Sequence, residues 1–441
     1  MKANGFSEES FGTEGIWRIL IHLAPPVMLA QLIQALYNIV DSFFVGKFSD
    51  DALTALTVIY PYQLLLIAFA VGTGVGVNAL MAKRYAEGDE KAADATGGAG
   101  VLLALLSWAV FAVLSVFLVE PFVKLSTKTD AVIKDATVYG LIVSVGSAGL
   151  FTESCFSKIH QARGNMLVPT IAQIAGAAVN IILDPILIFG WGPVKEFGVA
   201  GAAIATVAGQ VVAAAITGVK GFRMPPAFGK MSKIVKDIYK FAYPSILMQA
   251  LYFVYIQTLN VVLKKFGDPA VTVLGLYYKW QSLFFIPLFA LQTCIVPVLS
   301  YNYTRKNYSR CKAVVADTVI VSAVFMILGV FCFEVLPVPL IKLFSGGEEV
   351  IKIGKVAFRI IGLSFIPDAL SFNAPIVFQA TGKSGKSAFL SLLRQIFLLI
   401  PVFFLFSLIG VNYVWIAFPV AEIVTGLAGL LMFKKETETW I

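Results

Sequence analysis

The stretch Ala24-Pro-Pro-Val-Met-Leu-Ala-Gln-Leu-Ile-Gln-Ala-Leu-Tyr-Asn-Ile-Val-Asp41 decides how this chain folds. It lies in an apolar run long enough to cross a membrane as a helix. Pro25 and Pro26 near its start lack backbone N–H groups, so we expect them to bend or interrupt that helix. Its polar residues recur three or four positions apart and share one helix face: Gln31, Gln34, Tyr37, Asn38 and Asp41. An acid within a span is a functional candidate, and the alternative is that Asp41 lies at the membrane surface and only ends the span.

The composition indicates a polytopic helical membrane protein. Of 441 residues, 58% are hydrophobic and only 14% are charged, against about 25% charged in soluble domains. The apolar runs are roughly 20 residues long rather than alternating segments of about 10, which excludes a transmembrane barrel. Lys and Arg gather in every second loop, so the net charge of +8 reflects topology rather than nucleic-acid binding. By the positive-inside rule, these loops and both termini are cytoplasmic.

Twelve apolar runs are expected to span the membrane, with ends defined to within a few residues. They cover roughly residues 16–44, 52–81, 96–119, 134–159, 167–190, 198–220, 238–263, 271–298, 313–336, 351–378, 386–409 and 412–433. Their connections are short except for the basic loop 221–236. This loop divides the chain into an N-terminal six-helix lobe at 1–220, which would carry a cation site, and a C-terminal six-helix lobe at 237–441.

The two lobes repeat one pattern at a constant shift of 218 residues, without a gap over positions 24–164. The matching pairs include Pro26 with Pro244, Asp50 with Asp268, Tyr60 with Tyr278, Gln63 with Gln281, and Gln161 with Gln379. Because each copy has six spans, both enter the membrane from the same side. The predicted fold is therefore an all-α polytopic membrane protein with twelve transmembrane helices in two lobes related by an internal parallel repeat. Such repeats are typical of transporters that work by alternating access.

The acids of the first copy are not repeated in the second. Asp41 aligns with Leu259, and the polar pair Asn180 and Asp184 aligns with two apolar residues. An ion site would therefore be confined to the N-terminal lobe.

With these residues in view, the chain resembles the multidrug and toxic compound extrusion (MATE) transporters, specifically their DinF-like branch. The segments that carry the resemblance are Leu36–Gly46, Gly72–Asn78, Gln161–Asn165, Asn180–Pro185, Gly198–Thr206 and Phe378–Lys383. The resemblance implies an antiporter, not an enzyme, without a cofactor. It would export amphipathic or cationic drugs and toxic compounds in exchange for inward Na⁺ or H⁺.

The resemblance also implies particular site residues. The cation site falls on Asp41, Asn180, Asp184 and Thr206. The substrate-binding residues would be Gln34, Tyr37 and Asn38. Another branch of the family places acids in spans seven and ten. Span seven of this chain has no acidic residue. Asp368 in span ten lies about one helical turn away from the position of the acid in that branch, so we do not expect that branch's site here.

Two carboxylates, an amide and a hydroxyl form an all-oxygen set. Such a set suits Na⁺, which Asp41, Asn180 and Asp184 would then bind as a metal ion, and the two acids would equally take a proton. The sequence thus supports cation coupling without choosing the ion. We expect ion binding to relieve the cost of the buried carboxylates, to let the lobe close, and to bend span one at Pro25 and Pro26.

Three further ionisable residues fall within or beside the spans. Glu153 is expected to pair with Lys158 or Arg163 or to be hydrated, and Lys279 is expected to snorkel outward. Whether Asp368 takes part in the substrate cavity is open.

The sequence leaves two other functions to consider as alternatives. A lipid-linked oligosaccharide flippase, or another lipid flippase of the same superfamily, would need cations for a pyrophosphate, whereas this chain offers Gln, Asn and Asp. An enzyme acting on lipids would need a Ser-His, His-metal or acid–base set beyond the residues already assigned. The expected partners are small amphipathic or cationic substrates and membrane lipids, without nucleic acid. The chain is expected to be a monomer in the cytoplasmic membrane of a prokaryote.

Overall fold

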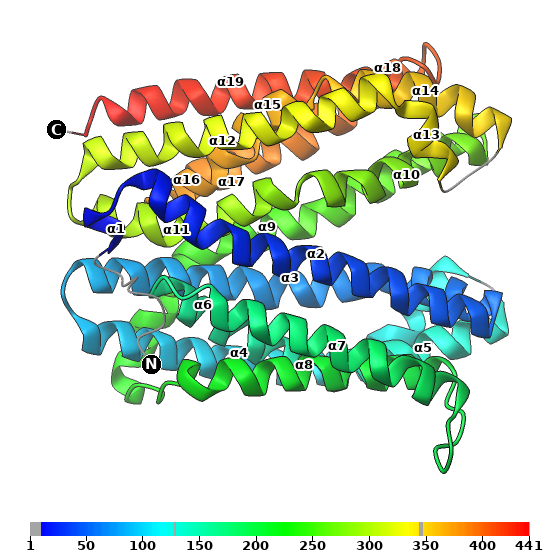
Figure 1. Ribbon diagram of the computed structural model, residues 1–441, viewed down its shortest axis with the longest axis horizontal. Helices are drawn as coiled ribbons and strands as arrows, with labels where there is room; N and C mark the ends of the chain where they lie inside the picture. Colours follow the sequence, from blue (N-terminus) through cyan, green and yellow to red (C-terminus); the bar gives the residue numbers. More distant parts are fainter. Residues whose placement is uncertain (1–9, 128, 344–346, 441) are drawn as a thin grey trace. The chain divides into compact units, whose positions relative to one another are not determined.

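The computed structural model describes residues 10–127, 129–343 and 347–440 (Figure 1). This part of the chain is built from helices and contains no β-strand. Ten of the described helices are long and apolar enough to cross a membrane, and two bent helix pairs bring the number to twelve. This agrees with the twelve predicted spans.

The first helices are α1 (Ser10–Thr13), α2 (Ile16–Phe48), α3 (Asp50–Ala86), α4 (Glu90–Ser126), α5 (Asp130–Val145), α6 (Ala148–Ala162), α7 (Leu167–Phe189), α8 (Val199–Gly221) and α9 (Phe228–Leu263). They are followed by η1 (Lys264–Phe266), α10 (Asp268–Phe284), α11 (Ile286–Thr304), α12 (Tyr308–Val335), α13 (Pro337–Lys342), α14 (Glu348–Gly362), α15 (Phe365–Ser371) and α16 (Asn373–Ala380). The last elements are α17 (Ser384–Leu392), the π-helix η2 (Leu393–Leu399), α18 (Ile400–Ser407), η3 (Val414–Ile416) and α19 (Ala417–Thr437).

Two compact units divide the chain. The first holds Ser10 and Pro25–Gln249, and the second holds Phe11–Ala24 together with the described chain from Ala250 onward. The boundaries fall inside helices α1, α2 and α9 rather than in a loop. The division of the chain into lobes at 1–220 and 237–441 stays a prediction, since the compact units describe only which residues pack together.

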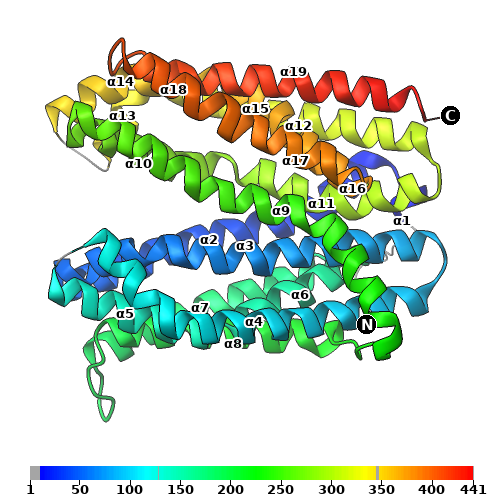
Figure 2. The same cartoon turned by 180° about the vertical axis from the view of Figure 1, so that it is seen from behind.

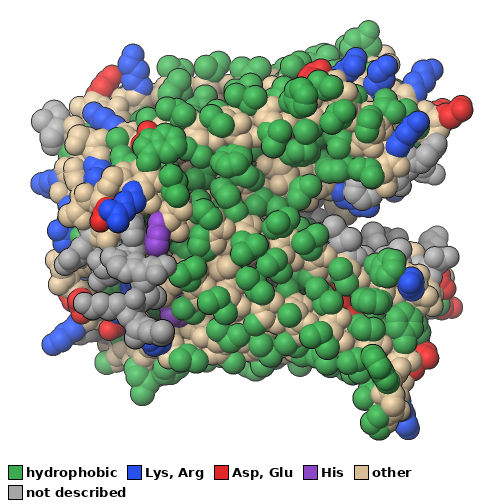
Figure 3. Space-filling view, in the orientation of Figure 1, with side chains coloured by type: hydrophobic (Ala, Val, Ile, Leu, Met, Phe, Trp, Pro, Cys, Tyr) green, Lys and Arg blue, Asp and Glu red, His purple; other side chains and the backbone are tan. Residues whose placement is uncertain are grey.

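The surface of each unit has the distribution of apolar and charged side chains that a membrane protein needs. In Figure 3 apolar side chains cover the middle of each unit, and Lys, Arg, Asp and Glu gather near the ends of the helices. On α4 the most exposed apolar residues are Val110, Val113, Val116 and Phe117. In water such a surface would favour aggregation, whereas lipid satisfies it.

Local sequence explains where α3 and α4 begin. Ser49 caps α3, since its hydroxyl accepts from the backbone N–H of Asp51 at 3.1 Å. Asp89 caps α4 by accepting from the N–H of Ala92 at 2.8 Å. Gly88, at φ +77°, reverses the chain between the two helices. Each cap satisfies an amide that the first helical turn leaves without a partner.

The proline pair does not interrupt the first span. Helix α2 runs unbroken through Pro25 and Pro26, which corrects the expectation that the pair might break it. The Thr170 hydroxyl of α7 donates to the Pro26 carbonyl at 2.8 Å. This hydrogen bond ties α2 to α7 at the proline pair.

Three predicted spans are not single straight helices. Predicted span four is the pair α5 and α6, bent by 45°, and predicted span ten is α14 followed by α15–α16, bent by 47°. The breaks lie at Gly146-Ser147 and at Leu363-Ser364, close to equivalent positions of the two copies. A Cβ on Gly146 would lie 2.6 Å from Val207 Cγ2, so glycine permits a close approach there. Predicted span eight is divided between α10 and α11 at Phe285.

Candidate cation site

Three helices of the first unit supply the predicted cation ligands. Asp41 comes from α2, Asn180 and Asp184 from α7, and Thr206 from α8. Helices α7 and α8 lie side by side (Figures 1 and 2). Asn180 and Asp184 are one turn apart on α7, and the Asn180 amide donates to Asp184 Oδ1 at 3.4 Å.

The acids of this site are buried and incompletely bonded. Asp41, Asn180 and Asp184 are 8%, 2% and 0% exposed. Asp41 Oδ1, Asn180 Oδ1 and Asp184 Oδ2 have no hydrogen-bond partner in the described part of the chain. The two carboxylates lie close enough to act on each other electrostatically. Buried oxygens without donors are costly, and a cation or proton would satisfy them. The donor set therefore fits Na⁺ or H⁺.

A tyrosine side chain, Tyr139, connects Thr206 to the other residues of the candidate site. The Tyr139 side chain of α5 lies against the side chains of Gln63 and Thr206 and within electrostatic range of Asp41. Thr206 is thus connected to Asp41 by way of Tyr139. The sequence analysis did not single out Tyr139, which is 4% exposed, or Gln63 as site residues. A tyrosine hydroxyl can donate to a carboxylate, so Tyr139 adds a donor near Asp41.

The predicted substrate residues lie on the same helix as Asp41. Gln34 is exposed, and Tyr37 is half-buried with Asp41, Tyr60 and Asp184 around it. The side chain of Asn38 lies outside the described residues. Tyr60 went unrecognised as a site residue, although it and Gln63, three positions on, share one face of α3 and both recur in the second copy.

Close packing of glycines sets the position of α8 against α7. A Cβ on Gly209 would lie 2.6 Å from the Gly176 carbonyl oxygen, and a Cβ on Gly176 would lie 2.7 Å from the Gly209 carbonyl oxygen. The same Gly209 position lies 3.4 Å from the Asn180 Cβ. The absence of two side chains therefore brings the helix that carries Thr206 directly against the helix that carries Asn180.

Pro185 follows the second acid without ending α7, which continues to Phe189. Because proline has no N–H, the carbonyl of Ile181 loses its helical donor. The helix therefore has one backbone hydrogen bond fewer in the turn that carries Asp184.

The other ionisable residues have distinct environments. Ser157 donates to Glu153 Oε1 at 2.6 Å. Of the two predicted partners of Glu153, Lys158 lies within its electrostatic range, and Arg163 instead bonds Asp94 at 3.1 Å. Lys279 is exposed, and its outward snorkelling stays a prediction. Asp368 is buried in a cluster of the second unit that the sequence analysis did not recognise.

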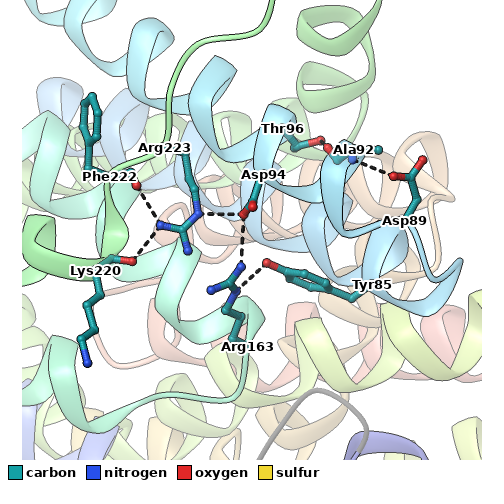
Figure 4. Close-up of polar contacts among 9 residues, drawn as sticks. All are labelled: Tyr85, Asp89, Ala92, Asp94, Thr96, Arg163, Lys220, Phe222 and Arg223. Carbon is teal, nitrogen blue, oxygen red and sulfur yellow. Dashed lines mark hydrogen bonds and ion pairs between the residues drawn. The ribbon is translucent and has the colours of Figure 1, made fainter.

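A polar cluster at one end of the first unit joins four elements (Figure 4). Asp94 of α4 accepts from Arg223 at 2.7 Å and from Arg163 at 3.1 Å, and Arg163 also donates to Tyr85 at 2.6 Å. Arg223 further donates to the carbonyls of Lys220 and Phe222. The cluster fixes the beginning of the segment that leads from α8 to α9.

The described residues contain no group of three or more His, Cys, Asp or Glu that could hold a metal ion. The candidate site has only two such residues, and its remaining ligands would be amide, hydroxyl and carbonyl oxygens. That is the ligand chemistry of a hard monovalent cation or a proton rather than of zinc or iron.

The helices, the duplicated halves and the buried acids together define a polytopic membrane transporter. The chain belongs to the MatE family, whose model matches residues 26–186 and again 244–405. The two matches begin 218 residues apart, at Pro26 and Pro244, in agreement with the internal repeat. The protein is therefore a MATE transporter and not an enzyme.

Two relatives match along nearly the whole chain. A protein of Shewanella oneidensis named FAD transporter is 23% identical over 431 residues, which cover 96% of this chain and 95% of the relative. The multidrug export protein MepA of Staphylococcus aureus is 24% identical over 439 residues, with 96% and 94% covered.

Solved structures share the fold. A transporter of the MOP superfamily from Pyrococcus furiosus superposes with a TM-score of 0.91 at 21% identity, covering 98% of both chains. An outward-facing multidrug resistance MATE transporter superposes with a TM-score of 0.90 at 21% identity, covering 100% of this chain and 99% of the other.

Proposed function

We propose that this protein is a secondary active antiporter of the cytoplasmic membrane that exports amphipathic or cationic compounds in exchange for inward Na⁺ or H⁺. The observation that carries the proposal is the pair of buried carboxylates, Asp41 and Asp184, whose free oxygens have no donor in the described chain. The name of the Staphylococcus aureus relative supports drugs as cargo. Assignment to the DinF-like branch, cytoplasmic termini and a monomeric state stay predictions.

The chemistry of the helix beside the acids favours neutral or cationic cargo. Gln34 and Tyr37 offer amide and phenol groups on the Asp41 helix, and neither carries a positive charge. An aromatic ring can stack on a flat cation or hold it by a cation–π contact. The name of the Shewanella oneidensis relative raises the alternative of an anionic dinucleotide cargo. A lipid flippase would likewise need cations for its phosphates, and these residues provide none.

Ion binding would couple transport to the ion gradient by lowering the charge of the pair. Two unpaired carboxylates in a low-dielectric interior cost at least several kcal/mol, and one bound Na⁺ or H⁺ lowers their net charge from −2 to −1 and so reduces that cost. The loaded and empty states therefore prefer different packings, which is what alternating access requires. One charge moving through about 100 mV releases about 2.3 kcal/mol. This would sustain on the order of a fifty-fold gradient of cargo.

The test is efflux of ethidium from proteoliposomes in which the Na⁺ gradient and the pH gradient are set separately. We expect wild-type efflux to follow one of the two gradients, and Asp41→Asn and Asp184→Asn to abolish coupled efflux while the protein stays folded. Asp130→Asn is the matched control, because this acid of the same unit is exposed.

Normal pumping by both Asn variants would show that the buried pair does not couple transport. Absence of efflux from folded wild-type protein would favour the flippase, and lipid-linked oligosaccharides would then be assayed in the same vesicles.

A further inference from the structure

A short hairpin, residues 190–198, joins α7 to α8 in the first unit. The Val194 amide donates to the Trp191 carbonyl at 3.2 Å, which closes a tight turn around Gly192 and Pro193. In both Figure 1 and Figure 2 the hairpin leaves the ends of α7 and α8 and projects sideways to these helices rather than along them. We call this segment the α7–α8 hairpin.

The base of the α7–α8 hairpin is fixed to the helices. The Phe197 amide donates to the Leu187 carbonyl at 3.0 Å. The Gly198 amide donates to the Ile188 carbonyl at 3.1 Å. Gly198 also lies against α2, since a Cβ there would be 2.9 Å from Phe48 Cζ. The hairpin is therefore a structured projection with a defined direction.

The backbone of the hairpin is closed at its neck by a glycine. Gly190 has φ +78°, a conformation that residues with a side chain rarely adopt. A Cβ on Gly190 would lie 3.0 Å from both the Val194 carbonyl oxygen and the Glu196 amide nitrogen. The two arms of the hairpin thus approach each other too closely to hold side chains between them, so the side chains point outward.

The side chains that point outward include large aromatic rings. Trp191 is 72% exposed and Phe197 is 48% exposed, and Phe189, where α7 ends, is 39% exposed. Figure 3 shows apolar side chains gathered on the projecting hairpin. Single exposed apolar residues are ordinary, whereas a cluster of aromatic rings on a structured projection indicates a surface that contacts something apolar.

The level of the hairpin along the helices identifies what it contacts. Helix α7 has 23 residues, which at 1.5 Å per residue is about 34 Å. The hydrocarbon core of a bilayer is about 30 Å thick. Phe189 at the end of α7 therefore lies near the boundary between hydrocarbon and headgroups. Because the hairpin projects sideways, it stays at this level, where tryptophan is enriched because its ring is apolar and its N–H is polar.

The charge of the hairpin indicates that its rings rather than its ions make the contact. Its only charged residues, Lys195 and Glu196, are adjacent, exposed and opposite in sign. Their charges cancel, so the hairpin has no net attraction to anionic headgroups. Trp191 and Phe197 can enter the headgroup layer of a neutral bilayer equally well.

We propose that the α7–α8 hairpin is a membrane-interface anchor, in which Trp191 and Phe197 lie among the lipid headgroups and hold the ends of α7 and α8 at that depth. These two helices carry Asn180, Asp184 and Thr206. The anchor would therefore fix one end of the helices that supply three of the four candidate cation ligands. It does not depend on the identity of the cargo or of the ion.

Fluorine NMR of the full-length protein in lipid nanodiscs tests the anchor without any transport. The six tryptophans are replaced by 5-fluorotryptophan, and Trp191→Phe identifies the Trp191 signal by its loss. Trp191→Tyr identifies the same signal if the first variant does not fold. We expect a nitroxide on the lipid headgroup to erase the Trp191 signal. A nitroxide at the end of the acyl chain, or a gadolinium chelate in water, should leave most of it.

Trp108 is the matched control. It lies near the middle of the α4 span and donates to the Val145 carbonyl at 2.8 Å. Its signal, identified with Trp108→Phe, should be erased by the acyl-chain nitroxide and not by the headgroup nitroxide. Nanodiscs of phosphatidylcholine alone and with phosphatidylglycerol should give the same result for Trp191, because the hairpin has no net charge.

Four outcomes would overturn the proposal. Erasure of the Trp191 signal by the aqueous chelate but not by the headgroup nitroxide would place the hairpin in water. Erasure by the acyl-chain nitroxide alone would place it in the hydrocarbon. A signal that resists all three probes would mean that protein, such as a second copy of this chain, covers the ring. Erasure by the headgroup nitroxide only with phosphatidylglycerol present would mean that charge rather than the rings makes the contact.

Discussion

Replacing Gly209 by alanine tests how the cation site is positioned. The new Cβ would lie 2.6 Å from the Gly176 carbonyl oxygen, about 0.8 Å short of the 3.4 Å at which ordinary contact begins. The obstructing atom belongs to the backbone and cannot rotate away, so α7 and α8 must separate. Such overpacking costs about 1–3 kcal/mol. The separation would also move Asn180 away from Thr206, so we expect weaker ion-coupled efflux.

The assay compares Gly209→Ala with Gly275→Ala in detergent. A Cβ at Gly275 on α10 meets nothing within 4 Å, so this control gains helix propensity without a clash. The difference between the two variants isolates the packing cost. For a unit of about 200 residues, each kcal/mol shifts the midpoint of thermal unfolding by roughly 2–4 °C. We therefore expect Gly209→Ala to melt about 2–12 °C below the control. Equal or higher melting of Gly209→Ala would refute the argument from close packing.

Three further expectations concern bonds described above. Thr170→Val should lower the unfolding free energy by about 1 kcal/mol, because the hydroxyl no longer donates to Pro26; an unchanged chemical-denaturation midpoint would contradict this. Asp94→Asn should speed tryptic cleavage of the segment after α8 with little loss of stability, since exposed ion pairs contribute about 1 kcal/mol or less; unchanged cleavage would contradict it. Glu436 raises the pKa of Lys383 above its usual 10.5, chiefly by hydrogen bonding. This stabilisation is present below pH 10.5 and is lost as pH rises through the raised pKa. The melting temperature of Lys383→Met should therefore fall less steeply with rising alkaline pH than that of the wild type. An identical dependence on pH would contradict the pairing.

The spans and the repeat could be predicted because they depend on hydrophobicity and on spacing along the chain. The twofold match of the family model and the twelve candidate spans agree with both. The bends of predicted spans four and ten could not be predicted in the same way. No proline marks the break at Gly146-Ser147, and the close contact of Gly146 with Val207 depends on packing between distant segments.

The residues of the candidate sites also differ in how far the sequence could predict them. Asp41 and Asp184 stand out as acids within apolar runs, and the structure places them within electrostatic range of each other. Arg394 and Glu422 lie within predicted spans eleven and twelve and carry an equal signal, which the predicted site residues did not include. Tyr139 gave no signal, since a tyrosine in a span is ordinary until its neighbours are known.

Helix α2 is one unbroken rod of 33 residues that belongs to both compact units. Its first turns, up to Ala24, pack with the second unit, and the remainder, with Asp41, packs with the first. Helix α9 is shared in the same way, with Gln249 as its last residue in the first unit. A chain cut in the segment after α8 would separate the first turns of α2 from the second unit and the first turns of α9 from the first. We therefore expect neither fragment to complete its compact unit without the other.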